Sequence, residues 1–230
     1  MGIKFRKKSE NDYDAGNIFW VTMSDLMLGL SIVFITLFVL AMTGFTQQTV
    51  HQQKMKMDVA KEISQELKKH NIDVKIDNMT GDLIIPSTAL FEVNSYVLTP
   101  AGKDLLSKLA PIYVNTLFKK KELVHDIDSI LIQGHTDSQT FAGVKTVNEQ
   151  FILNMDLSLK RANSVASYIL QTNYDKRNSD AFRKMIVVEG KSFNEPILSG
   201  GHEDYAKSRR VELKIKVRDW NVANAFGLKR

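Results

Sequence analysis

The hydrophobic pattern divides the chain into one long apolar run and a longer segment of mixed pattern. From Ile18 to Met42 the only charged residue is Asp25. As a helix rising 1.5 Å per residue, this run is about 37 Å long, enough to cross a bilayer core of about 30 Å with some tilt. A signal peptide has a shorter apolar core, without an internal carboxylate. We therefore expect one uncleaved transmembrane helix at residues 18–42.

Asp25 is the most informative residue of this run. Together with Thr22, Gly29, Thr36 and Thr43 it falls on one stripe at helical spacing, whereas the other sides are aliphatic and aromatic. Small and polar residues on one stripe indicate a helix–helix interface in a membrane. We therefore expect Asp25 to face protein and to exchange a proton, with Thr22, Gly29 and Thr36 lining the ion path. A hydrated carboxylate near the membrane surface and a simple dimer seam are the alternatives.

The flanking charges predict the orientation of this helix. The preceding segment, residues 1–17, is basic, and residues 43–53 contain no Lys or Arg; the basic residues are Lys4, Arg6, Lys7 and Lys8. The positive-inside rule places the basic flank in the cytoplasm. We expect a cytoplasmic arm at residues 1–17, a single pass through the inner membrane and a periplasmic remainder. The absence of cysteine excludes disulfides without identifying the compartment.

The segment after the apolar run is rich in Gln and Lys and predicts a helix. Met55, Val59, Ile63 and Leu67 recur every four residues, with no Gly or Pro between Thr46 and His70. We expect a periplasmic linker helix at residues 43–71. Pairing with a second copy of itself and a solvated linker both fit this pattern.

From residue 72 to 217 the pattern alternates between strands and helices. This alternation predicts an α+β fold, a sandwich with helices on one face of a sheet. Thr99 and Pro100 read as the N-cap and first residue of a helix. The expected strands are 72–76, 83–85, 127–133, 185–188 and 211–217, and the expected helices carry apolar faces at 105–117 and 159–169. Residues 218–230 form a tail to which no structure is assigned.

Composition narrows the functional classes. The net charge of +5 is modest, and the basic clusters are not interleaved with aromatic residues as in nucleic-acid-binding proteins. The chain has no nucleophile elbow, Walker loop or zinc motif, so we expect no catalytic residues, no cofactor and no enzymatic activity. His135 has no second His or Cys near it in sequence, and we expect it to be structural and not a metal ligand.

Four segments in order resemble the OmpA-like peptidoglycan-binding domain: LFEVNSYVLTPAGKDLL (90–106), IQGHTDS (132–138), NMDLSLKRANSVASYIL (154–170) and SRRVELKIKV (208–217). The resemblance implies that Asp137 and Arg161 bind the zwitterionic centre of the stem-peptide diamino acid. It also implies that Thr136, Asn154, Leu157 and Ser158 belong to the binding set. Ser208 stands where the family usually has Asn, and about nine additional residues around 141–149 change the rim of the pocket.

The chemistry of the pair agrees with this resemblance. A ligand that carries an ammonium and a carboxylate needs one anion and one fork of donors, and Asp137 with Arg161 supplies both. A structural Asp–Arg ion pair without any ligand is the alternative.

The membrane segment resembles the B subunit of MotA/MotB-type stators. The residues WVTMSDLM (20–27) are similar to the signature around the proton-carrying Asp of that family. The short linker helix and brief arm are closer to the ZorB class, from Zorya anti-phage defence systems, than to flagellar MotB. The resemblance implies a homodimer inside a ring of five MotA-like subunits, an ion path and anchoring to the cell wall. A flagellar stator, a passive membrane-tethered wall anchor and an outer-membrane OmpA-type protein are the alternatives.

Overall fold

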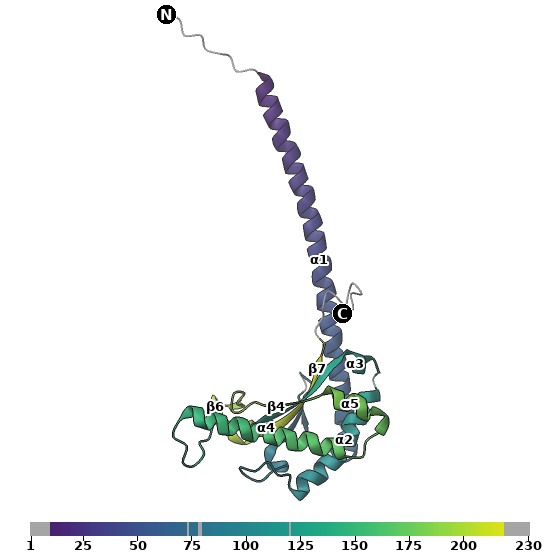
Figure 1. The fold of residues 1–230 in the computed structure, drawn as a ribbon. Coiled ribbons are helices and arrows are strands. Elements are labelled where there is room, and N and C mark those ends of the chain that lie inside the picture. Colours follow the sequence, from purple (N-terminus) through teal and green to yellow (C-terminus); the bar gives the residue numbers. More distant parts are fainter. Residues whose placement is uncertain (1–9, 73, 78–79, 120, 219–230) are drawn as a thin grey trace, which may run out of the picture. The chain divides into compact units, whose positions relative to one another are not determined.

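The computed structural model describes residues 10–72, 74–77, 80–119 and 121–218. The chain divides into two compact units, Met1–Val50 and His51–Arg230, and each is considered by itself. The elements are α1 (Glu10–Lys69), β1 (Lys75–Ile76), β2 (Leu83–Pro86), η1 (Ser87–Ala89), α2 (Pro100–Lys119), α3 (Lys121–Asp126), β3 (Ile127–His135), α4 (Val147–Gln171), η2 (Lys176–Asn178), α5 (Ser179–Met185), β4 (Ile186–Gly190), β5 (Leu198–Ser199), β6 (His202–Glu203), α6 (Tyr205–Ser208) and β7 (Arg210–Val217) (Figure 1).

The first unit is the N-terminal part of α1. Its segment Ile18–Gly44 is long and apolar enough to cross a membrane, two residues longer than the predicted span at its end. The hydroxyl groups of Thr22, Thr36 and Thr43 donate to carbonyls of the preceding turn at 3.0, 2.7 and 2.9 Å, so they need no external partner. Of the predicted arm, residues 1–9 lie outside the described residues, and from Glu10 onward the backbone is helical.

The C-terminal part of α1 belongs to the core of the second unit. Val59, Ile63 and Leu67 are no more than 2% exposed and lie in the same cluster as the apolar residues of the sheet. Ala60 packs beside Gly81 in the turn after β1. The sequence predicts for this stripe a linker helix at residues 43–71 that is either self-pairing or solvated. In the structure the stripe is covered by the chain's own domain, because burying these three side chains there removes them from water.

The end of α1 explains why the first strand is shorter than predicted. The N–H of Ile72 donates to the carbonyl of Leu67 at 2.9 Å, and Asn71 has a φ of 55°. This is a Schellman-type helix end, with Asn in the left-handed position and a buried apolar residue after it. Ile72 is therefore used to terminate the helix, and β1 begins only at Lys75.

The main sheet has five strands in the order β1-β2-β7-β3-β4. All neighbouring pairs are antiparallel except β3 and β4, which are parallel. A parallel pair needs a crossover connection, and here α4 lies between the two strands in sequence. A separate two-stranded sheet consists of β5 and β6. The expected α+β architecture is confirmed.

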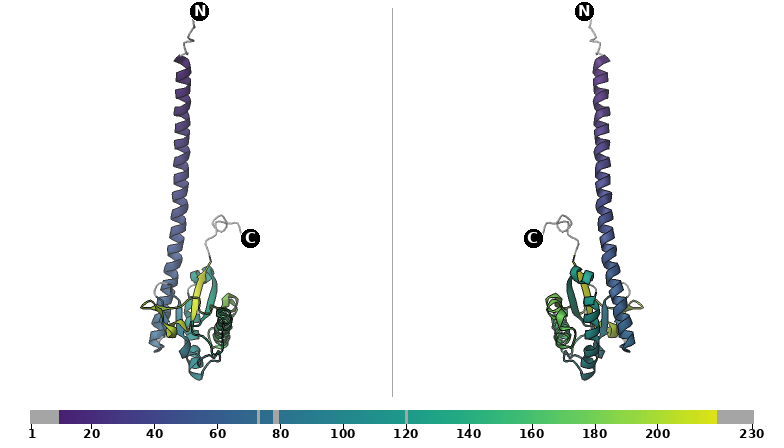
Figure 2. Two further views of the ribbon diagram at one scale, coloured as in Figure 1. Left: turned by 90° about the vertical axis from the view of Figure 1, so that its left-hand side faces the viewer. Right: turned by 90° about the vertical axis from the view of Figure 1, so that its right-hand side faces the viewer.

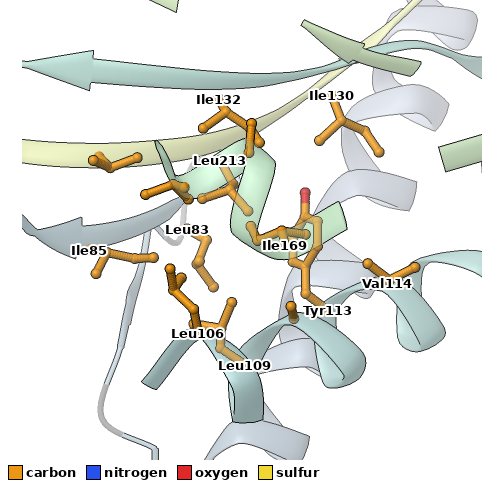
Figure 3. Close-up of a cluster of buried hydrophobic side chains, with 14 of the residues drawn as sticks. Leu83, Ile85, Leu106, Leu109, Tyr113, Val114, Ile130, Ile132, Ile169 and Leu213 are labelled. Carbon is orange, nitrogen blue, oxygen red and sulfur yellow. The ribbon is translucent and has the colours of Figure 1, made fainter. Parts of the chain in front are cut away.

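Alternation along the strands gives the sheet one apolar and one polar face. Ile130 pairs with Ile215, and Ile132 with Leu213, so their side chains line the core. Figure 3 shows Leu106, Leu109 and Tyr113 of α2, with Ile169 of α4, gathered against the apolar side chains of β2, β3 and β7. The alternate positions, among them His135 and Glu212, lie on the polar face.

Helix α4 lies along one face of the sheet, as the two side views show (Figure 2). It begins at Val147, twelve residues before the predicted apolar face at 159–169. The early start has a local cause, because Thr146 and Glu149 form a capping box. The predicted N-cap of α2 is also confirmed, since Thr99 Oγ1 accepts from the N–H of Gly102 at 3.0 Å. The predicted tail lies outside the described residues from position 219 onward.

The buried part of α1 predicts where a stable soluble fragment begins. A fragment starting at His51 is expected to unfold cooperatively, whereas one starting at residue 72 loses Val59, Ile63 and Leu67 from its core. Each such side chain contributes about 1.5–3 kcal/mol when buried. Thermal unfolding followed by circular dichroism compares the two fragments. Within the longer fragment, Ile63→Ala is expected to lower the Tm markedly and Met57→Ala, on the exposed side, very little; equal stability of both fragments contradicts this account.

Candidate functional site

The candidate site is a cavity of about 340 Å³ at the C-terminal end of β3. Its walls come from the segment around η1, the loop after β3, the middle of α4 and Arg209 just before β7. Five of the six predicted wall-binding residues line it: Thr136, Asp137, Asn154, Leu157 and Arg161. Residues of the loop after β3 and residues of α4, far apart in sequence, therefore line the same cavity.

A close approach of α4 to the sheet places these residues. A Cβ added to Gly134 would lie 2.0 Å from the carbonyl oxygen of Ser158, and one added to Gly190 would lie 2.8 Å from the N–H nitrogen of Leu159. Only glycine at these two strand positions lets the helix backbone come so near. Asn154, Leu157 and Arg161 lie within one turn of this contact, so the glycines set their distance from Asp137.

Ser158, the sixth predicted residue, is not among the residues lining the cavity. Its hydroxyl donates to the Met155 carbonyl at 2.9 Å and accepts from the Ser192 N–H at 3.1 Å. Ser192 also accepts, at its carbonyl, from the N–H of Thr136 at 2.9 Å. In this structure Ser158 therefore holds α4 to the turn after β4 and supports the loop that carries Asp137.

Asp137 is held at the start of the loop that follows β3. Its Oδ1 accepts from the N–H of Gln139 at 3.2 Å, which fixes the turn. Its Oδ2 accepts from Nη1 of Arg209, and this contact is an ion pair. Asp137 therefore pairs with Arg209. The alternative left open by the sequence, a structural ion pair between Asp137 and Arg161, is not what the structure shows.

Arg161 is anchored by a different segment of the chain. Its Nε donates to the carbonyl of Ser95 at 2.8 Å, and its guanidinium carbon lies 5.5 Å from the centre of the Phe91 ring. Burial and the neighbouring Arg209 lower the pKa of Arg161 to about 10, against the opposing effect of Asp137. Arg161 therefore stays protonated at neutral pH and presents a positive charge to the cavity.

Two buried hydroxyl groups in the cavity wall lack a partner among the described residues. They are Oγ of Ser87 and Oγ1 of Thr136. Buried polar atoms are nearly always hydrogen-bonded, so unpaired hydroxyls beside a cavity indicate a polar occupant. With Asp137 and Arg161, the cavity offers an anion, a cation and two groups that both donate and accept.

Sequence reasoning missed Arg209 and Ser87 as members of this site. Arg209 lies in the segment SRRVELKIKV that carries the OmpA-like resemblance, but no binding role was expected of its side chain. Ser87 carries no sequence signal, because it reaches the cavity through the turn of η1. The additional residues after Asp137 do reach the cavity, since Phe141 and Ala142 line it.

On the polar face of the sheet, His135, Glu195 and Glu212 bring one ligand atom each within 4.8 Å of one another. This geometry alone would suit a metal ion. However, Glu212 contacts Arg210 Nε and, at 2.7 Å, Lys214 Nζ, while Glu195 lies 3.9 Å from Lys191 Nζ. Burial raises the pKa of Glu212, but contacts with His135, Lys214 and Arg210 outweigh burial and hold it well below its usual range. Three cations around these carboxylates oppose a divalent ion and fit an internal ion-pair network instead.

The second group of predicted residues lies in the first unit. At 100° per residue, Thr22, Asp25, Gly29 and Thr36 fall within about 60° of one another around the helix axis, and all four are exposed on α1. A Cβ on Gly29 would meet nothing within 4 Å. The stripe therefore combines a carboxylate with a flat position at which another backbone can approach.

Comparisons with known proteins extend this picture. The OmpA family matches residues 90–210, more than half of the chain. The Zorya protein ZorB of Escherichia coli strain Crooks is 28% identical over 213 residues, covering 88% of this chain and 89% of that protein. The Zorya protein ZorB of Escherichia coli O139:H28 is 24% identical over 242 residues, covering 100% of this chain and 87% of that protein. A putative MotB-like protein from Desulfovibrio vulgaris has a similar fold, with a TM-score of 0.50 at 20% identity over 74% of this chain and 96% of that one.

Proposed function

Because the chain belongs to the OmpA family, we propose that its second unit binds peptidoglycan in the cavity between β3 and α4. The ligand group is the ammonium and carboxylate centre of the stem-peptide diamino acid. Asp137 binds the ammonium, and Arg161 binds the carboxylate through a planar fork of donors. The observation that carries this proposal is the pair of opposite charges in one cavity, each anchored by its own segment.

The neighbouring groups complete the recognition. Ser87 and Thr136 supply the hydroxyl groups that have no partner among the described residues. Asn154 and Leu157 form the wall on α4. Ser158 acts indirectly, by holding α4 in place.

Removing either charge is expected to abolish tight binding to the cell wall. Asp137→Ala leaves Arg209 and the ligand ammonium without their anion, and Arg161→Ala leaves the ligand carboxylate unpaired. Truncating one partner of a buried charge pair costs about 2–5 kcal/mol, which is about thirtyfold or more in affinity. The measurement is co-sedimentation of the detergent-solubilised full chain with intact sacculi.

Asp156→Ala is the matched control for these two variants. Asp156 lies on the same helix as Arg161, but its carboxylate is exposed and pairs with Lys160 at 2.7 Å. It should bind sacculi like the parent chain. Parent-like binding by both Asp137→Ala and Arg161→Ala would show that the site is assigned wrongly.

We further propose that the chain is the B subunit of an ion-driven stator in the bacterial inner membrane. The segment Ile18–Gly44 spans the membrane once, with the N-terminus in the cytoplasm and the second unit in the periplasm. Two copies lie inside a ring of five MotA-like subunits, and the stripe of Thr22, Asp25, Gly29 and Thr36 faces those partners. The observation that supports a helix facing partner subunits is the carboxylate of Asp25 on an otherwise uncharged segment.

In this proposal Asp25 carries protons, and the cavity of the second unit anchors the complex to the wall. The role is mechanical, and no reaction is catalysed by this chain. The similarity to two proteins named Zorya protein ZorB supports anti-phage defence as the output over flagellar rotation. A passive wall anchor is the competing function, and it differs in one testable respect, because it does not need Asp25.

A further inference from the structure

Among the described residues, four charged side chains line the cavity, two more than a zwitterion site requires. Asp137 is the buried anion, Arg161 and Arg209 are cations, and Glu92 is an exposed second carboxylate. Arg209 occupies the carboxylate oxygen of Asp137 that an incoming ammonium would need. The second oxygen of Asp137 already accepts from the N–H of Gln139. An ammonium that approaches Asp137 at Oδ2 therefore competes with Arg209 for this carboxylate.

The surroundings of Asp137, Arg161 and Arg209 identify which of them can move. Arg161 is 3% exposed and is fixed by the Ser95 carbonyl and the Phe91 ring. The Asp137 side chain is 10% exposed, whereas that of Arg209 is 32% exposed. Besides Asp137, Arg209 has one long side-chain contact among the described residues, from Nη1 to Gln139 Oε1 at 3.3 Å. Arg209 is therefore the mobile member of the group.

We propose that Arg209 is an exchangeable counter-ion that makes the cavity selective for ligands carrying both an ammonium and a carboxylate. The proposal rests on the proposed function of this cavity in binding peptidoglycan. When a zwitterion enters, its ammonium takes the place of Arg209 at Asp137, and Arg209 turns to the ligand carboxylate beside Arg161. The ion pair that is broken is replaced by two new ones.

A ligand with only one of the two charges cannot complete this exchange. An ammonium alone displaces Arg209 from Asp137 but offers Arg209 no new partner. The ion pair between Arg209 and Asp137 is then lost when the one between the ammonium and Asp137 forms. A carboxylate alone binds Arg161 without disturbing Asp137. Arg209 therefore acts as a specificity-determining residue, and it penalises amines that lack a carboxylate.

The test is competition against sacculi bound by the detergent-solubilised full chain. The competitors are meso-diaminopimelate, cadaverine, which lacks both carboxylates, and pimelate, which lacks both amines. For the parent chain we expect meso-diaminopimelate to compete far better than either analogue. Arg209→Gln keeps an amide that can donate to Asp137 but removes the charge. It is expected to improve competition by cadaverine about fivefold relative to meso-diaminopimelate, the upper scale of a partly exposed ion pair, and to leave competition by pimelate unchanged.

Two further variants separate exchange from a loss of structure. Arg209→Lys keeps the charge and should retain the parent order of the three competitors. Lys207→Gln removes a positive charge two residues away that pairs with Asp204, outside the cavity, and should change nothing. An equal change for all three competitors in Arg209→Gln overturns the exchange and makes Arg209 a structural support. Failure of meso-diaminopimelate to compete with the parent chain overturns the proposed function, and the exchange with it.

Discussion

Gly134→Ala is expected to destabilise the second unit strongly and to abolish binding to sacculi. The new Cβ would lie 2.0 Å from the carbonyl oxygen of Ser158 and 2.8 Å from its carbonyl carbon. Neither side can easily yield, because β3 is paired with both β7 and β4, and the clashing atoms are helix backbone. Overpacking at well-ordered sites costs about 1–3 kcal/mol and occasionally more, and this contact belongs at the upper end.

The same change is expected to disturb the site. If α4 moves away from β3 to make room, Asn154 and Arg161 move with it, whereas Asp137 stays with the sheet. The two charges would then no longer be spaced for one ligand. Urea unfolding of the fragment starting at His51 measures the stability, and co-sedimentation of the full chain with sacculi measures the binding.

Gly143→Ala is the control for this prediction. Gly143 has a φ of 85°, but a Cβ there would meet nothing within 4 Å. It should cost about 1 kcal/mol, the usual penalty for a left-handed backbone without glycine. A Gly134→Ala protein as stable as the Gly143→Ala protein would show that α4 is free to shift.

The elements that the sequence predicted well are those whose signals are local. The strands at 127–133 and 211–217 alternate with period two, and Thr99 with Pro100 marks the start of α2. The start of α4 also has a local signal, the capping box of Thr146 and Glu149. It was not predicted, because the prediction rested on the apolar periodicity from residue 159 onward. The short elements α3, α5 and the β5–β6 pair were not predicted, because a few residues carry too little periodicity.

The predictions that failed concern contacts between residues far apart in sequence, which a local sequence pattern does not determine. The repeat of Val59, Ile63 and Leu67 is the same whether the helix pairs with a second copy, is solvated or packs against its own domain. Only the fold shows that the covering surface is the domain itself. Similarly, the resemblance brought Asp137 and Arg161 to one cavity, but the ion pair to Arg209 depends on how the segment before β7 meets the loop after β3.

Asp25→Asn is expected to leave the complex assembled and to abolish its activity. Asn has nearly the shape of Asp but cannot release a proton. An ionised carboxylate in a membrane is costly, so its protonation is coupled to its access to water and to the partner helices. Moving one charge through the full potential supplies about 2.3 kcal/mol per 100 mV, enough to bias a conformational step when transfers accumulate. Asp25→Glu keeps the titratable group and should retain part of the activity.

The Asp25 variants are tested for both assembly of the complex and phage resistance. Cells producing the chain with a MotA-like partner are assayed for phage resistance, and the complex is purified from the same cells to compare membrane insertion and subunit content. Asp58→Asn, the same change at an exposed position of α1 within the second unit, is the matched control and should behave as the parent. Loss of activity with normal assembly in Asp25→Asn supports ion transfer at this residue, because wall binding depends on the separate charges of Asp137 and Arg161. Full activity with Asn at position 25 would leave the passive wall anchor as the function of this chain.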